Sequence, residues 1–227
     1  IYDTANSESL LSTIIKERNL NTDEYKPRDI HSRISLAKNN LVTAEAYAAN
    51  PSFVSEDRQR KRPEFSAIFL EYARRCKANN AMDFDDLLIY ANILFRDFPD
   101  ALEQYRNRFR YILVDEYQDT NYAQYLIVRR LAQTHSNVCV VGDDAQSIYS
   151  FRGAKIENIL RFQNDFPEAK VFKLEQNYRS TQNIVNAANS IIAKNDRQIP
   201  KHVFSENDEG DRVKVLKAYT DQEEAYL

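Results

Sequence analysis

Two pairs of acidic residues follow short apolar segments of the chain. Asp115 and Glu116 come directly after the residues YILV, and Asp143 and Asp144 come after the residues VCVVG. A carboxylate at the end of a strand can bind Mg²⁺, and a second carboxylate beside it can polarise an attacking water molecule. This pattern is typical of a site that hydrolyses a nucleotide. An aliphatic strand that ends in two acids is common, however, and residues 142–144 also fit a simple turn.

Two further side chains could act on a phosphate group. Gln146 follows the second acidic pair, and Arg179 follows a third apolar segment, residues 171–174. An amide can donate a hydrogen bond to the γ-phosphate, and a guanidinium can neutralise the charge that develops there. The alternative is that residues 177–181 only begin a helix, with a serine or threonine as its cap. Because three polar groups follow three consecutive apolar segments, the sequence favours a nucleotide site.

The elements that position these residues differ between two parts of the chain. Up to residue 108 the apolar residues recur at helical spacing, and from residue 109 short apolar segments alternate with helical ones. The second pattern predicts right-handed βαβ units and a parallel sheet. Ligands of such sheets bind outside the carboxyl ends of the strands, where these polar residues stand. Helices are expected around residues 10–15, 30–41, 63–78, 84–95, 122–132, 156–162 and 181–193, and strands at residues 111–114, 137–141 and 171–174.

Local signals set finer expectations for some of these segments. The continuous aliphatic residues 111–114 are expected to be buried on both faces of the sheet. Ser7 is a possible cap of the first helix, and the polar residues 49–62, which lack periodicity, are expected to form an exposed connection. Asp83 is expected to cap the helix that follows it. Helix capping also explains the three aspartates of residues 83–86 more simply than a metal site does.

Composition narrows the class of protein without identifying it. The chain has 43% hydrophobic and 29% charged residues and a net charge of −3. Any nucleic acid must therefore be bound by local basic patches rather than by the field of the whole chain. The two cysteines, Cys76 and Cys139, form no CxxC pair and are expected to be buried, reduced thiols of a cytoplasmic protein. No apolar segment of about 18 residues indicates a membrane span.

Glycine is scarce, and the scarcity bears on the phosphate chemistry. The sequence contains three glycines, and none of them belongs to a phosphate loop of the pattern GxxxxGK[ST]. Such a loop holds the phosphates with backbone N–H groups and a lysine. The chain also begins with Ile1 rather than methionine. We therefore expect it to be an internal piece of a longer protein.

Four segments resemble the motifs of superfamily 1 DNA helicases of the UvrD/Rep/PcrA type. Residues 113–121 (LVDEYQDTN) resemble motif II, residues 141–154 (VGDDAQSIYSFRGA) motif III and residues 174–181 (LEQNYRST) motif IV. Residues 81–88 (AMDFDDLL) resemble a shorter element that precedes motif II in this family. The long forms of these motifs are highly specific, and they occur in order across nearly the whole chain. The resemblance implies an ATP-driven DNA helicase.

The resemblance also implies an α/β fold in three regions. Residues 1–108 resemble the helical 1B subdomain, which contacts duplex DNA in this family. Residues 109–178 resemble the later half of the first RecA-like motor domain, 1A, with its parallel sheet. Residues 179–227 resemble the beginning of the second motor domain, 2A, with its next strand at residues 213–218.

The resemblance assigns a role to each residue of the expected nucleotide site. Asp115 is expected to bind the Mg²⁺ of Mg-ATP, and Glu116 to activate the attacking water. Gln146 is expected to sense the γ-phosphate, which Arg179 reaches from across the cleft between the motor domains. Tyr178 is expected to stack near the adenine. ATP and Mg²⁺ are thus the expected cofactors of the intact protein.

The resemblance implies single-stranded and duplex DNA as partners, together with the remainder of the helicase chain. Tyr149 and Phe151 are expected to stack on bases of the single strand, and Arg152 also to bind DNA. Many members of the family have tryptophan where this chain has Phe151. Movement from 3′ to 5′ is suggested by the resemblance alone. Because the phosphate loop, the adenine-reading segment and motifs V and VI are absent from these residues, the polypeptide is not expected to hydrolyse ATP by itself.

Two questions stay open at this point. Basic residues within segments 58–62 and 74–77 could contact DNA phosphates. They could equally form a solvated face, because acidic and basic side chains are equally frequent in residues 1–110. The chain could also be a binding or regulatory piece, such as the motor region of a helicase–nuclease assembly whose ATPase has decayed. All four residues assigned to phosphate chemistry are present, which favours the enzyme.

Overall fold

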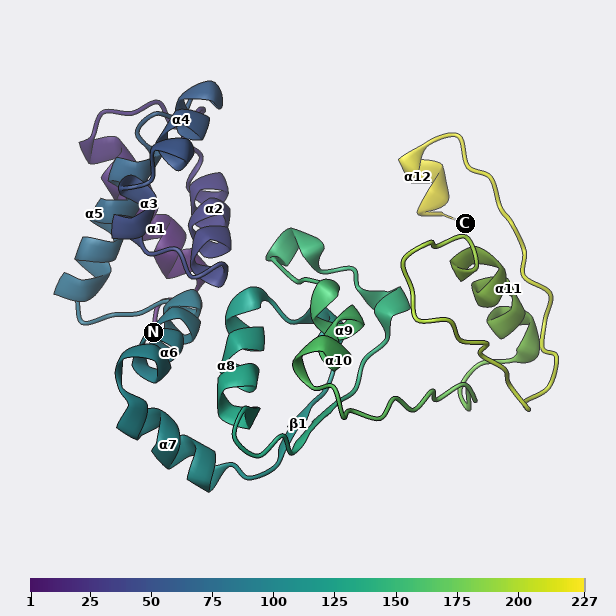
Figure 1. Cartoon of the computed structure of the whole chain (residues 1–227). Helices are drawn as coiled ribbons and strands as arrows, with labels where there is room; N and C mark the ends of the chain where they lie inside the picture. Colours follow the sequence, from purple (N-terminus) through teal and green to yellow (C-terminus); the bar gives the residue numbers. More distant parts are fainter. Residues whose placement is uncertain (227) are drawn as a thin grey trace. The chain divides into compact units, whose positions relative to one another are not determined.

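The computed structural model describes residues 1–226, with the main chain alone at Arg152 (Figure 1). The chain forms two compact units, Ile1–Phe166 and Pro167–Leu227. The first unit contains a group of helices followed by a small parallel sheet and its own helices. The described residues of the second unit form two helices, joined by segments without regular secondary structure. The expected mixture of helices with a parallel sheet is confirmed.

The first five helices share a core. They are α1 (Thr4–Glu17), α2 (Pro27–Asn39), α3 (Ala44–Ala48), α4 (Pro51–Gln59) and α5 (Phe65–Ala78). The inner faces of α1, α2, α3 and α5 meet in a cluster of buried side chains, most of them isoleucine and aromatic residues, and the partly buried Phe53 of α4 packs against it. Each such side chain contributes about 1.5–3 kcal/mol when it leaves water. The apolar spacing of the sequence predicted α1, α2 and α5, and it missed α3 and α4.

The expected cap at Ser7 is wrong, because α1 begins earlier. Asp3 is the residue that caps this helix, and its Oδ1 accepts a hydrogen bond of 2.8 Å from the N–H of Asn6. Ser7 lies inside the first turns and is fully buried. Its hydroxyl instead forms a hydrogen bond of 3.0 Å with the hydroxyl of Tyr72, whose oxygen accepts while its own proton points to Asp83. The Ser7 side chain thus makes a tertiary contact with α5 instead of capping α1.

The connection expected at residues 49–62 is largely exposed as predicted, apart from Asp57, but it is not irregular, because α4 occupies most of it. Asn50 caps this helix by accepting a hydrogen bond of 3.0 Å from the N–H of Ser52. The residue that α4 buries is Asp57, whose carboxylate pairs with Arg33 and accepts a hydrogen bond of 3.0 Å from Tyr47. A charged residue on the inner face leaves no apolar stripe in the sequence, so helical spacing could not reveal this helix.

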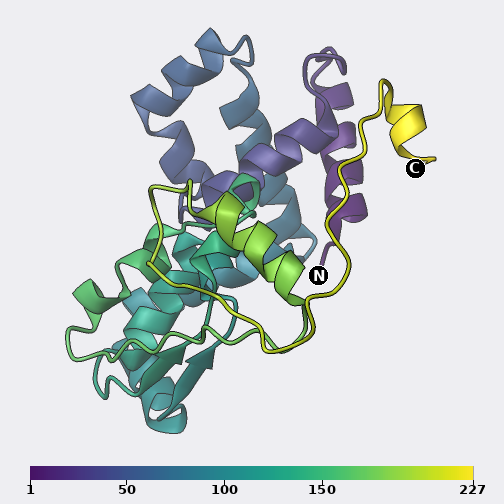
Figure 2. The same cartoon turned by 90° about the vertical axis from the view of Figure 1, so that its right-hand side faces the viewer.

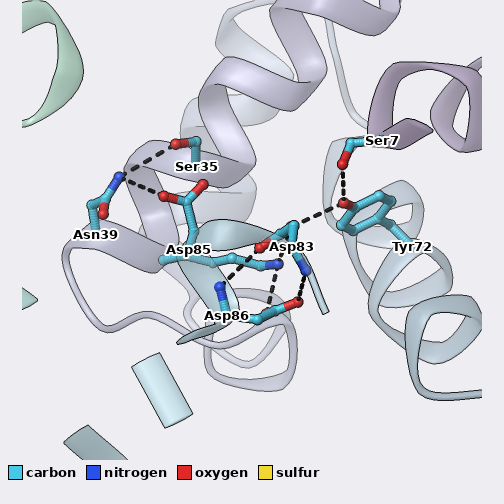
Figure 3. Close-up of polar contacts among 8 residues, drawn as sticks. Ser7, Ser35, Asn39, Tyr72, Asp83, Asp85 and Asp86 are labelled. Atoms are coloured by element: carbon cyan, nitrogen blue, oxygen red, sulfur yellow. Dashed lines mark hydrogen bonds and ion pairs between the residues drawn. The ribbon is translucent and has the colours of Figure 1, made fainter. Parts of the chain in front are cut away.

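Helix α6 (Phe84–Asp97) connects the helical part of the first unit with the sheet, and α7 (Pro99–Arg108) follows it. Its expected cap is confirmed, since Asp83 Oδ1 accepts from the N–H of Asp86 at 2.8 Å and Asp86 Oδ2 accepts from the N–H of Asp83 at 3.1 Å. Figure 3 shows this cap beside Tyr72, whose hydroxyl donates to Asp83 Oδ2 at 2.9 Å. The start of α6 is therefore fixed to α5.

A buried lysine neutralises the carboxylates at this cap. Nζ of Lys38, from α2, lies 2.6 Å from Asp83 Oδ2 and 2.7 Å from Asp86 Oδ1. Burial acts to lower the pKa of Lys38, but the two carboxylates outweigh burial and hold it above its ordinary value. Burial likewise acts to raise the pKa of Asp83, which the Lys38 ammonium holds below its usual range. Asp83 and Asp86 thus pair with a lysine of the same chain and form the cap of α6. This agrees with the interpretation that they cap the helix.

The sheet consists of two parallel strands, β1 (Ile112–Val114) and β2 (Val138–Val140), which Figure 2 shows as neighbouring arrows. Helix α8 (Tyr122–Ala132) lies between them in sequence and agrees with the predicted bounds. Leu113 pairs with Cys139, and both side chains are exposed, Leu113 to 79%. The expected burial of the first strand on both faces and of Cys139 is therefore wrong, because one face of this short sheet is uncovered among the described residues.

The other cysteine, Cys76, lies in α5 and is buried as expected. Burial raises the pKa of its thiol to about 11. The thiol therefore stays protonated near neutral pH and is a poor nucleophile there. Among residues 1–226, no helix is long and apolar enough to cross a membrane.

Short helical turns follow each strand. They are η1 (Tyr117–Asp119) after β1, and η2 (Asp144–Gln146), η3 (Ser150–Arg152), α9 (Glu157–Leu160) and α10 (Phe162–Asp165) after β2. The helix expected at residues 156–162 is thus interrupted at Arg161. Beyond the break, Phe162 packs edge-on against Tyr117, with ring centroids 5.7 Å apart. This contact attaches the last helices of the unit to the turn after β1.

The second unit contains α11 (Gln182–Ile192) and α12 (Asp221–Glu224). Thr181 precedes α11 at its cap position, and α11 was predicted to within a residue. The strands expected at residues 171–174 and 213–218 are wrong: neither segment forms a strand, and Leu174 is 83% exposed. A strand requires a hydrogen-bonded neighbour. The described part of this unit provides one short parallel bridge, between Gln176 and Phe204.

Candidate active site

Parallel pairing brings the carboxyl ends of β1 and β2 together. The N–H of Val141 donates to the carbonyl of Val114 at 2.8 Å, and the carbonyl of Val141 accepts from the N–H of Tyr117 at 2.9 Å. The two acidic pairs, which follow these strands, are therefore neighbours at one edge of the sheet. The third polar group expected at this edge, around Arg179, lies in the second unit and is described only within that unit.

The first acidic pair stands in an unusual backbone conformation. Glu116 has a φ of 49° and a ψ of 41°, the left-handed region that glycine favours. For a residue with a side chain this conformation costs about 1–3 kcal/mol, and such residues gather at functional sites. The N–H of Glu116 donates to Oδ1 of Asp115 at 2.9 Å. Both side chains are exposed, so both carboxylates are accessible to a ligand.

The side chain of Gln118 joins the two strand ends. Its Nε2 donates to Oε2 of Glu116 at 2.7 Å, and its Oε1 accepts from the N–H of Asp143 at 3.0 Å. Gln118 is 1% exposed. The sequence did not single out this residue, because its contacts depend on a main-chain group 25 positions away. A lone glutamine inside a motif carries no pattern that reveals such contacts.

The first acidic pair opens onto a cleft of about 480 Å³. Its lining combines carboxylates with apolar side chains of α6 and α8 and comprises Leu88, Val114, Asp115, Glu116, Asp119, Thr120, Gln124, Ile127 and Val128. Oδ1 of Asp119 is buried there and accepts no hydrogen bond from any of the residues described. Carboxylate oxygens are the ligands that Mg²⁺ prefers. The described residues hold no group of three such side chains placed to bind a metal ion, so Asp115 and Glu116 supply only part of the ligands that the expected Mg²⁺ needs.

The second acidic pair organises the turn that carries Gln146. Asp143 Oδ1 accepts from the N–H of Ala145 at 3.0 Å, and its Oδ2 accepts from Nε2 of Gln146 at 2.7 Å. Asp144 is buried, whereas Gln146 is exposed. The side-chain amide of Gln146 thus lies just after β2, and one of its N–H groups already donates a hydrogen bond to Asp143. Donation to a phosphate from this N–H group requires the amide to leave Asp143.

The two aromatic residues expected to contact DNA lie together after η2. The rings of Tyr149 and Phe151 stack with centroids 5.9 Å apart and an angle of 29° between their planes. Tyr149 is 39% exposed and Phe151 is 74% exposed. Gly153, with a φ of 86°, ends their turn in a conformation that disfavours other residues. The side chain of Arg152, the third residue expected here, lies outside the described part of the chain.

The remaining expected site residues belong to the second unit. Tyr178 is 79% exposed, and its hydroxyl donates to Oε1 of Gln176 at 2.9 Å. Arg179 is exposed, and its N–H donates to Oδ1 of Asn177 at 2.9 Å. Asn177 Oδ1 also accepts from the N–H of Ser180 at 2.8 Å, so the asparagine fixes the turn that presents Tyr178 and Arg179.

Several basic residues of the helical part are already paired with acids. Arg60 pairs with Glu56 at 2.7 Å and Arg62 with Asp29 at 3.0 Å, while Arg74 and Arg75 both pair with Glu71. Exposed ion pairs of this kind contribute little to stability. They do reduce the positive charge available to DNA phosphates, which favours the interpretation of these residues as a solvated face.

Comparison with known proteins agrees with the motifs at the strand ends. Residues 1–167 match the model of the UvrD/REP helicase N-terminal domain, and residues 172–227 match that of the UvrD-like helicase C-terminal domain. The chain therefore belongs to the UvrD/REP helicase family, and the resemblance found in the sequence is confirmed.

Individual relatives are similar along nearly the whole chain. The ATP-dependent DNA helicase PcrA of Staphylococcus epidermidis is 43% identical over 230 residues, which cover 99% of this chain and 30% of the relative. The protein of the same name from Bacillus subtilis (strain 168) is 45% identical over 217 residues, covering 96% of this chain and 29% of the relative. The chain thus spans about 30% of the length of the curated relatives that it matches.

Proposed function

We propose that this chain forms part of an ATP-driven DNA helicase, which moves from 3′ to 5′ along a single strand and separates the duplex. The observation that carries the proposal is the hydrogen-bonded junction of the two strand ends, where Asp115 and Glu116 lie next to the turn that holds Gln146. Similarity to relatives named ATP-dependent DNA helicases supports the same function.

Each residue of the site is assigned a separate role in ATP hydrolysis. Asp115 would hold the magnesium ion, which when bound would neutralise charge on the phosphate oxygens. Glu116 orients the attacking water and takes up its proton. Gln146 exchanges its hydrogen bond with Asp143 for one to the γ-phosphate. Arg179 stabilises the charge of the transition state, and Tyr178 stacks near the adenine.

DNA contact is assigned to the aromatic pair that follows η2. Stacking on bases requires exposed aromatic faces, and Tyr149 and Phe151 present two such rings together. Arg152 is assigned to the same strand. Gln146 and these two rings lie on one segment after β2. Binding of ATP and binding of DNA can therefore influence each other through the few residues that separate them.

We further propose three regions within the chain. Residues 1–108 act as a helical subdomain that contacts duplex DNA. Residues 109–178 form the later half of the first motor domain, and residues 179–227 begin the second. In this arrangement Arg179 acts on the nucleotide from the second motor domain, and Tyr178 lies at the end of the first.

The test is DNA-stimulated ATP hydrolysis and strand separation by the full-length gene product, with Glu116→Gln as the diagnostic variant. The amide is nearly isosteric, so binding of Mg-ATP should persist. Single-turnover hydrolysis should fall by about 10²- to 10⁴-fold, as on loss of a general base, and unwinding should fall with it. Wild-type hydrolysis by the variant, or hydrolysis with lost ATP binding, contradicts the mechanism.

A further inference from the structure

The side-chain amide of Gln118 is held in one orientation by two neighbours of opposite character. A carboxylate can only accept hydrogen bonds, and a backbone N–H can only donate them. Nε2 of Gln118 faces the Glu116 carboxylate at 2.7 Å, and Oε1 faces the N–H of Asp143 at 3.0 Å. Turning the amide by 180° would break both hydrogen bonds. It would place Oε1 against the Glu116 carboxylate and Nε2 against the N–H of Asp143. The orientation is therefore fixed by chemistry as well as by burial.

The main chain after β2 is shaped around this amide. A Cβ atom at Gly142 would overlap Oε1 of Gln118 and lie 2.9 Å from Cδ1 of Ile159. A side chain at position 142 must therefore displace the amide or the backbone. In addition, the hydroxyl of Ser147 donates to the carbonyl of Gln118 at 3.3 Å. Gln118 is thus anchored to the segment after β2 at two points, while its side chain reaches Glu116.

We propose that Gln118 is a positioning residue for Glu116, an inference that rests on the function proposed above. Glu116 is exposed and stands on a left-handed turn, so its own surroundings leave the carboxylate several rotamers. The hydrogen bond from Gln118 selects one of them. Because the amide is anchored at Asp143, the carboxylate is held at a fixed place relative to the end of β2, where Gln146 stands. Glu116 and Gln146 are thereby aligned on one phosphate.

The decisive variant is Gln118→Glu in the full-length gene product. The new carboxylate keeps an acceptor for the N–H of Asp143 and nearly the same volume, but it replaces the donor that faces Glu116 with an oxygen that repels it. Single-turnover hydrolysis should fall by about 10²-fold, the effect of a displacement of about 1 Å at a reacting group. The affinity for Mg-ATP should be retained, which separates a loss in kcat from a loss in KM.

Asn92→Ala is the matched control. Asn92 is another buried amide of the first unit, and it donates to the carbonyls of Leu88 at 3.0 Å and Ala123 at 2.9 Å. Its removal costs hydrogen bonds of the same kind without touching Glu116, so hydrolysis at saturating ATP should stay at the wild-type rate. If Asn92→Ala slows hydrolysis as much as Gln118→Glu does, lost stability explains both effects and the positioning role is overturned.

A second variant and a double variant test whether Gln118 acts through Glu116. Gln118→Met is uncharged and similar in length, and it should also slow hydrolysis. In the Glu116→Gln background, either change at Gln118 should cost nothing further, because a residue that acts through Glu116 has no effect without it. A further loss of about 10²-fold in that background would overturn the proposal.

The failures of the two proposals are distinguishable. If Glu116→Gln abolishes hydrolysis while both Gln118 variants keep the wild-type rate, the positioning role is wrong and the proposed function stands. If Glu116→Gln hydrolyses ATP at the wild-type rate, the proposed function and the role of Gln118 both fail.

Discussion

Asn121 donates from its Nδ2 to Oδ1 of Asn39 over 2.8 Å, although the two residues are 82 positions apart. Asn121 also caps α8, since its Oδ1 accepts from the N–H of Gln124 at 2.9 Å. Asn39 ends α2, and its Nδ2 donates to Oδ1 of Asp85 at 3.1 Å, as Figure 3 shows. Three helices of the first unit therefore meet at these two side chains, next to the residues that follow β1.

Asn39→Ala should destabilise the chain by about 1–3 kcal/mol, because it leaves the buried Nδ2 of Asn121 without its acceptor and removes one hydrogen bond to Asp85. Urea unfolding of the 227-residue chain measures the change in free energy. Asn40→Ala is the control, since Asn40 is less buried and its side chain donates only to the carbonyl of Leu36 in its own helix. The control should cost no more than about 0.5 kcal/mol. Equal losses from both variants would show that the contact with Asn121 adds nothing.

The stability of the chain should decline in alkaline solution. Burial raises the pKa of Tyr47 to about 12, and the carboxylates of Asp83 and Asp86 outweigh burial to raise the pKa of Lys38. Both groups bind a proton more tightly in the folded chain than in the unfolded chain, where their pKa values are about 10 and 10.4. Their contribution is therefore complete below about pH 10. The part from Tyr47 is lost as the pH rises towards 12, and the part from Lys38 is lost as the pH rises through its raised pKa.

The measurement is the free energy of unfolding between about pH 7 and 12, with Tyr47→Phe as the comparison. Phenylalanine cannot titrate, so the decline above about pH 10 should be shallower in this variant. Stability that rises above pH 10, or an identical slope in the variant, would contradict the assignment.

Loss of either aromatic ring after η2 should weaken single-strand binding. Tyr149→Ala or Phe151→Ala in the full-length gene product should cost about 1–3 kcal/mol for each stacking partner removed. Hydrolysis without DNA should change little, since neither ring is assigned to phosphate chemistry. Fluorescence anisotropy with a labelled single strand measures the affinity. Phe98→Ala is the control, because Phe98 is also exposed, to 59%, but lies at the end of α6. Unchanged binding by both ring variants would mean that they do not contact the strand.

Asp115→Asn should change the metal requirement of hydrolysis, in contrast to Glu116→Gln. The neutral amide is a weaker ligand for Mg²⁺ than a carboxylate, so a higher Mg²⁺ concentration should be needed for half-maximal turnover. A titration of Mg²⁺ at fixed ATP in the full-length gene product gives this concentration. Asp100→Asn, at an exposed position in the first turn of α7, is the control and should keep the wild-type dependence. An unshifted titration for Asp115→Asn would exclude Asp115 as the metal ligand.

The features that the sequence predicted well are those decided by nearby residues. Asp83 caps α6 because the aspartate and the N–H group it accepts from are three positions apart. The bounds of α8 follow from its apolar spacing and from the cap at Asn121. The acidic pairs at the strand ends share one edge because the parallel pairing of β1 and β2 leaves them no other place.

The errors arise where a distant contact decides the outcome. α4 was missed because Asp57 is buried by pairing with Arg33, so the helix lacks an apolar stripe. Residues 171–174 have the composition of a strand but no neighbouring strand among the described residues. The role of Gln118 could not be predicted, because its partner Asp143 lies close to it only in the folded chain.

The core of the first five helices is built wholly from residues between Leu11 and Cys76. The sheet, by contrast, needs Ile112 to meet Val138 across an intervening helix. The hydrogen bonds within each helix join residues four positions apart and form faster than the pairing of two separate strands. During synthesis the helical core can therefore be complete before either strand has left the ribosome. In refolding experiments the helices should recover their protection from hydrogen exchange first, and the strand ends that carry Asp115 and Glu116 should recover it last.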